Sequence, residues 1–349
     1  SVLTTGQRIS VRNANMQIHR LGINSNSWKL LGYTISENAG DSYVADLTGY
    51  AINNAQLNNS DWFGKYAGTF VYGLIEANEA GTGDYVYDPD FMNDLLNDPE
   101  AMSNLHNSSR AIADEGRWEA GSIEFQNAFD SINTLLIPNG AKYINNTRFT
   151  HVEGQYNFKN EIRFFDLTIG ANWRMYDLRS DGTLFPDSKS NPIRINEYGS
   201  YMQLSKKLID YHLKILLSVR YDKTENFKGQ FSPRLSGVYT VLNNHNFRAS
   251  YQTGFNMPTS QDQYMDLDAI SYRPIGGLQE FIDKYRVKEW SYALQSVNAF
   301  SESVVEGSPD PDLLVQYSGW SQLKPEHVQV LEVGYRGMFS KKFIIDAYY

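Results

Sequence analysis

The sequence of 349 residues contains no cysteine, which excludes a disulfide framework, a Cys-bound zinc site and a thiol nucleophile. Apolar residues never run for 18 positions, so no transmembrane helix is predicted. A membrane β-barrel is compatible with this, because alternating strands keep the hydropathy low. Basic charge is also scarce, with 31 Lys+Arg against 40 Asp+Glu, and no basic patch indicates nucleic-acid binding.

Signals for catalysis and for targeting are missing as well. The 6 histidines show no paired spacing, and no phosphate-binding loop, dinucleotide fingerprint or nucleophile elbow occurs. We therefore expect a protein that is not an enzyme, with no cofactor and no metal site. The first ten residues lack the regions of a signal peptide, and the last alternating run continues to the final residue, so we expect a piece of a longer chain.

Large rings are abundant instead: 24 Tyr, 18 Phe and 6 Trp make 14% of a chain whose mean hydropathy is −0.47. Rings supply burial that disordered chains lack, so an ordered fold is predicted. From about residue 147 onward, apolar and polar residues alternate, as in 163–177, where Leu167, Ile169 and Trp173 share one face. A period of two residues is typical of strands and would scatter these rings around a helix.

Ten strands are predicted on this basis, and their connections alternate between short and long. The strands are 14–23, 28–38, 147–158, 162–178, 194–208, 211–224, 231–242, 246–255, 325–339 and 342–349. Short turns are expected at 24–27, 159–161, 209–210, 243–245 and 340–341, and longer connections at 39–146, 179–193, 225–230 and 256–324. Short turns at one end and long loops at the other are typical of outer-membrane barrels. The predicted fold class is all-β, a transmembrane antiparallel β-barrel.

The two longest connections are too long to be structureless. Helices are predicted within 39–146: one begins at Asp98-Pro99 and ends near Gly116, one begins at Ser122, and a weaker one begins at Ser60-Asp61. We therefore expect residues 1–349 to form a partial barrel domain with helix-containing extracellular loops at about 39–146 and 256–324.

Four phrases follow one another on these strands: Arg220-Tyr221-Asp222, Ser232-Pro233-Arg234-Leu235, the run from Arg248 to Phe255, and Leu323-Lys324-Pro325-Glu326 with the following Glu332-Val333-Gly334-Tyr335. In this order they resemble the C-terminal barrel of TonB-dependent outer-membrane transporters. The run from Arg194 to Tyr201 and Asn38-Ala39-Gly40-Asp41-Ser42-Tyr43 resemble the Bacteroidota branch of that family.

The resemblance covers most of the chain, from about residue 14, and implies a 22-stranded barrel with an N-terminal plug domain. Plug, energy-coupling segment and about half of the strands would lie outside this chain. The sequence departs from the family at Asn256, where an Arg usually follows the Gly-Phe pair. The implied location is the bacterial outer membrane. The implied partners are its lipid and lipopolysaccharide and the TonB complex, reached through the missing N-terminal part; a surface lipoprotein is a further candidate, and nucleic acid is not expected.

Strand alternation gathers a set of polar residues on the face opposite the apolar one. In a barrel this face is the lumen, so the set could line a substrate path or contact the plug, and the alternative is a ladder of ion pairs that holds the wall. The candidates are Asp166, Asn172, Arg174, Lys214, Arg220, Asp222, Arg234, Arg248, Gln252, Glu332 and Arg336.

Aromatic residues give two further expectations. On the apolar face, Tyr211, Tyr221, Tyr239, Tyr251, Tyr335 and Trp173 could form girdles at the membrane interfaces. In the long loop, Tyr264, Tyr272, Tyr285, Trp290 and Trp320 are candidates for extracellular ligand capture, against the alternative that they pack the loop on itself. The acidic clusters at 88–90, 266–268 and 310–312 could touch calcium but match no EF-hand spacing.

The predicted function is a TonB-dependent outer-membrane receptor that binds and imports a nutrient such as a glycan or peptide. One alternative is a receptor-like barrel that serves as a structural subunit of an outer-membrane assembly or secretion complex. A second is a soluble all-β carbohydrate-binding protein, which the segregated loop lengths do not favour.

Overall fold

The computed structural model describes residues 2–4, 7–242, 244–269, 272–340 and 342–349. The chain divides into two compact units: unit 1 holds residues 1–12 and 41–143, and unit 2 holds residues 13–40 and 144–349. Among the described residues, no helix is both long enough and apolar enough to cross a membrane.

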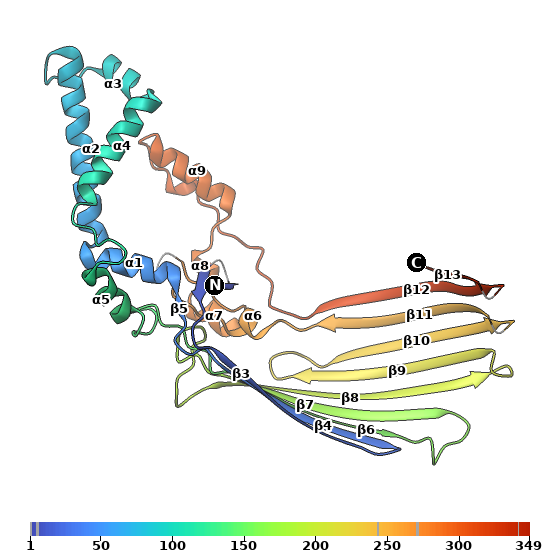
Figure 1. The fold of residues 1–349 in the computed structure, drawn as a ribbon. Coiled ribbons are helices and arrows are strands. Elements are labelled where there is room, and N and C mark those ends of the chain that lie inside the picture. Colours follow the sequence, from blue (N-terminus) through green and yellow to red (C-terminus); the bar gives the residue numbers. More distant parts are fainter. Residues whose placement is uncertain (1, 5–6, 243, 270–271, 341) are drawn as a thin grey trace. The chain divides into compact units, whose positions relative to one another are not determined.

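Unit 2 is built on one antiparallel sheet of ten strands, which Figure 1 shows side by side. Each strand pairs with its neighbours in the chain, except that β4 pairs with β6 across the residues of unit 1. The sheet is open, with β3 and β13 as its edges. The strands are β3 (Asn15–Asn24), β4 (Trp28–Asn38), β6 (Arg148–Asn157), β7 (Asp166–Leu178), β8 (Ile193–Leu208), β9 (Leu213–Thr224), β10 (Gln230–Val241), β11 (His245–Asn256), β12 (Glu326–Phe339) and β13 (Phe343–Tyr348).

The sheet has two chemically different faces, because successive side chains point to opposite sides. The pairing of Tyr251 with Leu331 and of Leu235 with Tyr251 places apolar side chains opposite each other across strands. Many of them are open to the surroundings, including Phe231 at 68% and Leu331 at 70% exposure. We call this side the apolar face and the other side the polar face.

All ten predicted strands are confirmed, with two corrections at turns. Residues 162–165 do not belong to β7, because Glu161 and Ile162 donate backbone hydrogen bonds to the Phe158 carbonyl and form a tight turn there. The connection 158–165 is therefore longer than 225–229, and loop length does not alternate strictly. Tyr211 is also outside its strand: it lies in a turn with Ile209 and Asp210, all three at positive φ, and so cannot join a girdle on the sheet. The predicted turns at 243–245 and 340–341 include Asn243 and Lys341, which lie outside the described residues.

The longer connections of unit 2 pack together into an ordered structure, which we call the loop cap (residues 179–192, 225–229, 257–269 and 272–325). It contains α6 (Ser260–Tyr264), α7 (Gln279–Lys284), α8 (Val287–Trp290), α9 (Leu294–Val305) and a 3₁₀ turn at Pro311–Leu313. The Asp266 amide donates to the Leu184 carbonyl at 2.9 Å and joins two of the loops. Its buried side chains include the large apolar residues Leu184, Phe185, Phe227, Met265, Leu267, Phe281 and Ile282.

Unit 1 combines a small sheet with five helices. The sheet has the order β1-β2-β5, from Val2–Thr4, Gln7–Ser10 and Tyr43–Val44. The helices are α1 (Ala45–Gln56), α2 (Asn59–Thr82), α3 (Pro89–Leu96), α4 (Pro99–Ala113) and α5 (Ile123–Ile132), and Figure 1 shows α2 and α4 side by side.

The three helices predicted in this segment are confirmed as α2, α4 and α5. Two more were missed. α3 begins at Asp88-Pro89, where the Asp88 carboxylate accepts hydrogen bonds from the amides of Asp90 and Phe91. This is the same capping arrangement as Asp98-Pro99, so the acidic cluster at 88–90 is a helix start. α1 has no side-chain cap at Val44 and carries Gly49, so the sequence offered no starting signal.

Candidate functional site

All eleven polar candidates lie on the polar face of the sheet. Pairing places Asn172 opposite Gly199 and Gly199 opposite Asp222, and it places Arg234 opposite Gln252. The remaining candidates follow in steps of two along their strands or by direct pairing, as Glu332 does with Ser250 and Arg336 with Asp346. The face is therefore a continuous polar surface that crosses strands β7 to β12.

Arg220 is the centre of a tight cluster on this face. Its Nε donates to Asp222 Oδ2 at 2.6 Å, and its Nη2 donates to Asp222 Oδ1 at 2.5 Å and to Asn172 Oδ1 at 2.8 Å. A bidentate guanidinium–carboxylate pair is among the stronger hydrogen-bonded arrangements. The cluster spans β7 to β9, with Gly199 of β8 between its partners.

Gly199 leaves the space that this cluster occupies. A Cβ on that residue would lie 2.4 Å from Asn172 Oδ1, 2.6 Å from Arg220 Nη2 and 2.7 Å from Asp222 Oδ1. Any other residue would push the three polar groups apart. Packing, and not backbone conformation, therefore requires a glycine at residue 199.

A second chain of contacts runs through His151, a residue to which the sequence gave no role. Arg174 Nε donates to His151 Nδ1 at 3.3 Å, and His151 Nε2 lies 3.2 Å from Glu153 Oε2. Because a guanidinium can only donate, the His151 proton resides on Nε2 and is donated to Glu153. Arg174 also lies 3.7 Å from Glu197. The alternation of 148–157 places His151 and Glu153 on the polar face, and that signal could have identified both.

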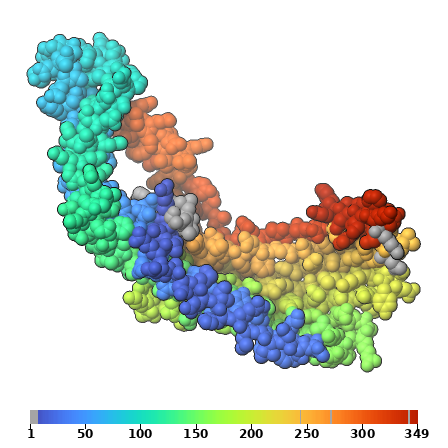
Figure 2. Space-filling model, viewed as in Figure 1, coloured from blue at the N-terminus to red at the C-terminus, as the bar shows by residue number. Residues whose placement is uncertain are grey.

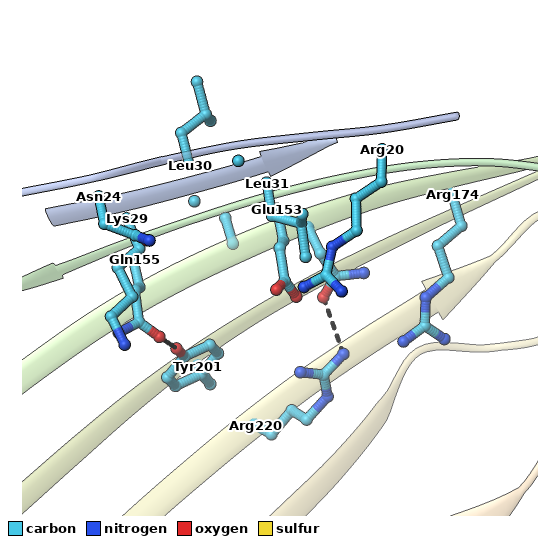
Figure 3. Close-up of a pocket in the computed structure, with 14 residues that line it drawn as sticks. Arg20, Asn24, Lys29, Leu30, Leu31, Glu153, Gln155, Arg174, Tyr201 and Arg220 are labelled. Atoms are coloured by element: carbon cyan, nitrogen blue, oxygen red, sulfur yellow. Dashed lines mark hydrogen bonds between the residues drawn. The ribbon is translucent and has the colours of Figure 1, made fainter. Parts of the chain in front are cut away.

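These groups border a groove on the polar face (Figure 3). Four cationic side chains, Arg20, Lys29, Arg174 and Arg220, line it together with Glu153. Tyr201 donates to Gln155 Oε1 at 2.8 Å along its wall. The groove offers an excess of donors and of positive charge, which suits carboxylate, phosphate or carbonyl groups. Arg20 and Lys29 were not among the predicted polar residues, the first of which is Asp166.

Elsewhere on the polar face, separate pairs link the strands. Ser250 of β11 donates to Glu332 Oε2 of β12 at 3.1 Å, and Ser205 of β8 donates to Asp166 Oδ2 of β7 at 3.3 Å. Arg248 Nη2 of β11 lies 3.1 Å from Asp346 Oδ1 of β13 and so reaches across β12. Cross-strand contacts of this kind are what the ladder alternative predicts. They agree with a wall-stabilising role for these candidates.

The five aromatic candidates of the loop cap fall into two groups. The Tyr264 hydroxyl accepts from Asn226 at 2.8 Å, and the Tyr285 hydroxyl donates to the Asp266 carboxylate at 2.8 and 2.9 Å, so both rings pack the loop on itself. Tyr272, Trp290 and Trp320 are exposed. Trp320 lies edge-on to Tyr317, and the Arg286 guanidinium lies over the Trp290 ring. The exposed three are the members of the set that a ligand can reach.

Asp266 is the electrostatic centre of the loop cap. It is buried, and it receives Arg273 Nε at 2.7 Å and Lys284 Nζ at 2.9 Å in addition to Tyr285. Burial by itself raises the pKa of Asp266, but the hydrogen bonds from Lys284, Arg273 and Tyr285 outweigh it and hold that pKa below its ordinary value. The acidic cluster at 266–268 is therefore an ion-pair centre.

At 310–312, Asp310 caps a 3₁₀ turn through the Asp312 amide. Within the part of the chain that the structure describes, no three His, Asp or Glu side chains gather as metal ligands.

Substituting Gly199→Ala should disrupt the Arg220 cluster and lower the free energy of unfolding by about 1–3 kcal/mol, the usual cost of overpacking. Urea unfolding of the chain in detergent micelles, followed by tryptophan fluorescence, measures this. Gly254→Ala is the matched control, because it lies on the same face and its new Cβ would meet no atom within 4 Å. Equal effects of the two variants would contradict the packing role of Gly199.

Asp266→Asn should loosen the loop cap at neutral pH, at a cost of about 1–3 kcal/mol for the lost charge-assisted hydrogen bonds. Because the folded pKa lies below the unfolded value of about 3.9, the stabilisation by Asp266 is full above that pH and is lost as the pH falls through the folded pKa. An acid-stable protease should therefore cut the wild-type cap much faster near pH 3 than at pH 6, whereas the variant should be cut readily at both. A variant with the wild-type pH response would show that another group stabilises the cap.

Comparison with known proteins identifies the family. Residues 13–349 match the family model described as TonB dependent receptor-like, beta-barrel. No curated protein matches the chain.

Among solved structures, the siderophore receptor PirA from Pseudomonas aeruginosa aligns with 96% of this chain and 38% of its own at 9% identity, with a TM-score of 0.43. The siderophore receptor PirA from Acinetobacter baumannii aligns with 94% of this chain and 41% of its own at 13% identity, with a TM-score of 0.39. The chain thus spans well under half the length of these receptors. Because the matched region contains all of unit 2 and residues 41–143 of unit 1, the chain belongs to the TonB-dependent receptor β-barrel family.

Proposed function

We propose that this chain is part of an outer-membrane receptor that binds a nutrient outside the cell and imports it, with energy from the TonB complex. The observation that carries the proposal is the two-faced sheet. One face presents apolar side chains, such as Phe231, Leu331 and Leu235, each more than half exposed in this chain. Exposed apolar surface of this extent is unfavourable in water and suits a lipid environment.

The polar face would then border the interior of a larger barrel, completed by strands outside this chain. The open edges at β3 and β13 would pair with those strands, since unpaired strand edges are costly within a membrane. The groove lined by Arg20, Lys29, Arg174 and Arg220 would face the plug or the substrate path. The proposed location is the bacterial outer membrane, where the family resides.

The membrane orientation predicts different outcomes for neighbouring residues of β8. Met202 lies on the apolar face opposite Val219 and Ile169, and Gln203 lies on the polar face opposite Ser218 and Thr168. An Arg that faces lipid near the bilayer centre costs about 2–4 kcal/mol. Met202→Arg should therefore reduce assembly of the full-length receptor in outer membranes far more than Gln203→Arg, as measured by the heat-modifiable gel mobility of folded barrels. Equal assembly would argue against a lipid-facing apolar surface.

Ligand capture is assigned to the loop cap, at the end of the sheet where the long connections gather. Trp290 and Trp320 offer exposed rings suited to sugars or to peptide side chains. Removing the whole loop would also remove Asp266, whose amide donates to the Leu184 carbonyl, so point substitutions test capture more cleanly.

The double variant Trp290→Ala/Trp320→Ala in the full-length receptor should leave assembly unchanged and reduce nutrient uptake about tenfold or more, as loss of binding hot spots does. Growth on oligosaccharides and on peptides as sole carbon source would measure uptake and separate the two ligand classes. Trp28→Ala is the control: Trp28 is also exposed but begins β4 at the short turn 25–27. Growth that never depends on the receptor would instead support the structural-subunit role.

A further inference from the structure

The connection from α2 to α3 lies at the end of this helical unit (Figures 1 and 2). It carries three consecutive large side chains that are exposed. Tyr85 is 71%, Val86 69% and Tyr87 67% exposed. Single exposed apolar residues are common on proteins, but clusters of large ones usually mark interaction sites.

The backbone that carries these residues is fixed from within the unit. Asn78, on the last turns of α2, is only 4% exposed. Its Nδ2 donates to the carbonyls of Asp84 at 3.1 Å and Val86 at 2.9 Å, and its Oδ1 accepts from the Asp88 amide at 3.1 Å. The backbone that carries Tyr85 and Tyr87 is therefore already ordered, so little backbone entropy would be lost on binding.

Neighbouring residues of α2 extend the same surface. Tyr72 and Ile75 are exposed. The neighbouring Glu76 raises the pKa of Tyr72, and Glu79 raises the pKa of Tyr85. Tyr85 and Tyr72 are close enough to influence each other electrostatically. We call this surface the tyrosine patch; it consists of Tyr72, Ile75, Glu76, Glu79, Tyr85, Val86 and Tyr87.

Charge around the patch is of one sign. Residues 66–109 contain 8 Asp and Glu and no Lys or Arg. Unit 1 as a whole carries 16 Asp+Glu against 6 Lys+Arg, whereas the rest of the chain carries 24 against 25. Unit 1 therefore carries a formal charge of −10 and the rest of the chain +1, so the net charge of −9 arises entirely from unit 1.

We propose that the tyrosine patch is a docking surface for a basic polypeptide segment of another protein. Lys and Arg side chains bind the faces of tyrosine rings and pair with adjacent carboxylates, and this patch contains both groups. A small cation would be satisfied by the carboxylates alone and would leave the exposed rings and Val86 uncovered. A polypeptide covers rings, aliphatic groups and carboxylates together.

The test measures peptide binding to the full chain in neutral maltoside micelles by fluorescence anisotropy. The probe is a fluorescein-labelled twelve-residue peptide of Lys, Arg, Ser and Gly, which lacks large apolar residues and so avoids the micelle. A peptide with Glu and Asp in place of Lys and Arg is the negative probe. The basic peptide should bind, more weakly as salt rises, and the acidic peptide should not.

Two variants locate the site. Tyr85→Ser/Tyr87→Ser and Glu76→Gln/Glu79→Gln should each raise the dissociation constant at least tenfold, with the far-ultraviolet circular dichroism unchanged. The matched control Glu115→Gln/Glu119→Gln removes the same charge from exposed positions of the same unit and should change it less than twofold. The proposal is overturned if the basic peptide does not bind, if the acidic peptide binds equally, or if the control variant weakens binding as much as the patch variants.

Discussion

The register of the ten-stranded sheet is the constraint on which the rest of unit 2 depends. Side chains alternate strictly along each strand, so a slip of one residue in any pair would carry charged groups to the apolar face. The register is fixed chemically at several places by side chains that meet only in this alignment. Arg220 and Asp222 of β9 meet Asn172 of β7 across β8. Arg248 of β11 meets Asp346 of β13 across β12. Contacts between polar side chains thus fix the strand register, and this register places the apolar side chains together on the opposite face.

That dependence explains why Gly199 matters more than its size suggests. The central strand of the Arg220 cluster must pass beneath the bonded groups without adding a side chain, and only glycine does so. A similar relation occurs at Gly170, whose missing Cβ leaves room for the Tyr201 ring, within 2.7 Å of where that atom would lie. In both cases a glycine on the polar face gives space to a large side chain on a neighbouring strand.

The sequence predicted the strands well because period-two alternation is local and each strand shows it independently. It placed the polar candidates on one face for the same reason, because residues two apart along a strand lie on the same side of the sheet. It could not predict which of them touch: the meeting of Arg174 with His151, or of Asp266 with Arg273 and Lys284, depends on how strands and loops are brought together. The helix α3 was missed for a different reason, because its Asp88-Pro89 cap was interpreted as an acidic cluster. Tyr264 and Tyr285 show the same limit, since an aromatic residue in a loop looks alike in sequence whether it packs inward or stays exposed.

The separation of unit 1 from the sheet follows from where its chain enters and leaves. Strand pairing continues up to that point: the Glu37 amide donates to the Thr147 carbonyl at 2.9 Å, and the Ala39 amide donates to Asn145 at 3.0 Å. The Asn145 side chain also donates to Glu37 Oε2 at 2.8 Å. Because β4 and β6 fix the two ends of the insertion next to each other, its length adds little to the cost of closing the connection. Formation of the sheet therefore depends little on the amino-acid composition of residues 41–143. Unit 1 accordingly concentrates negative charge and exposed tyrosines, whereas the charges of unit 2 are nearly balanced.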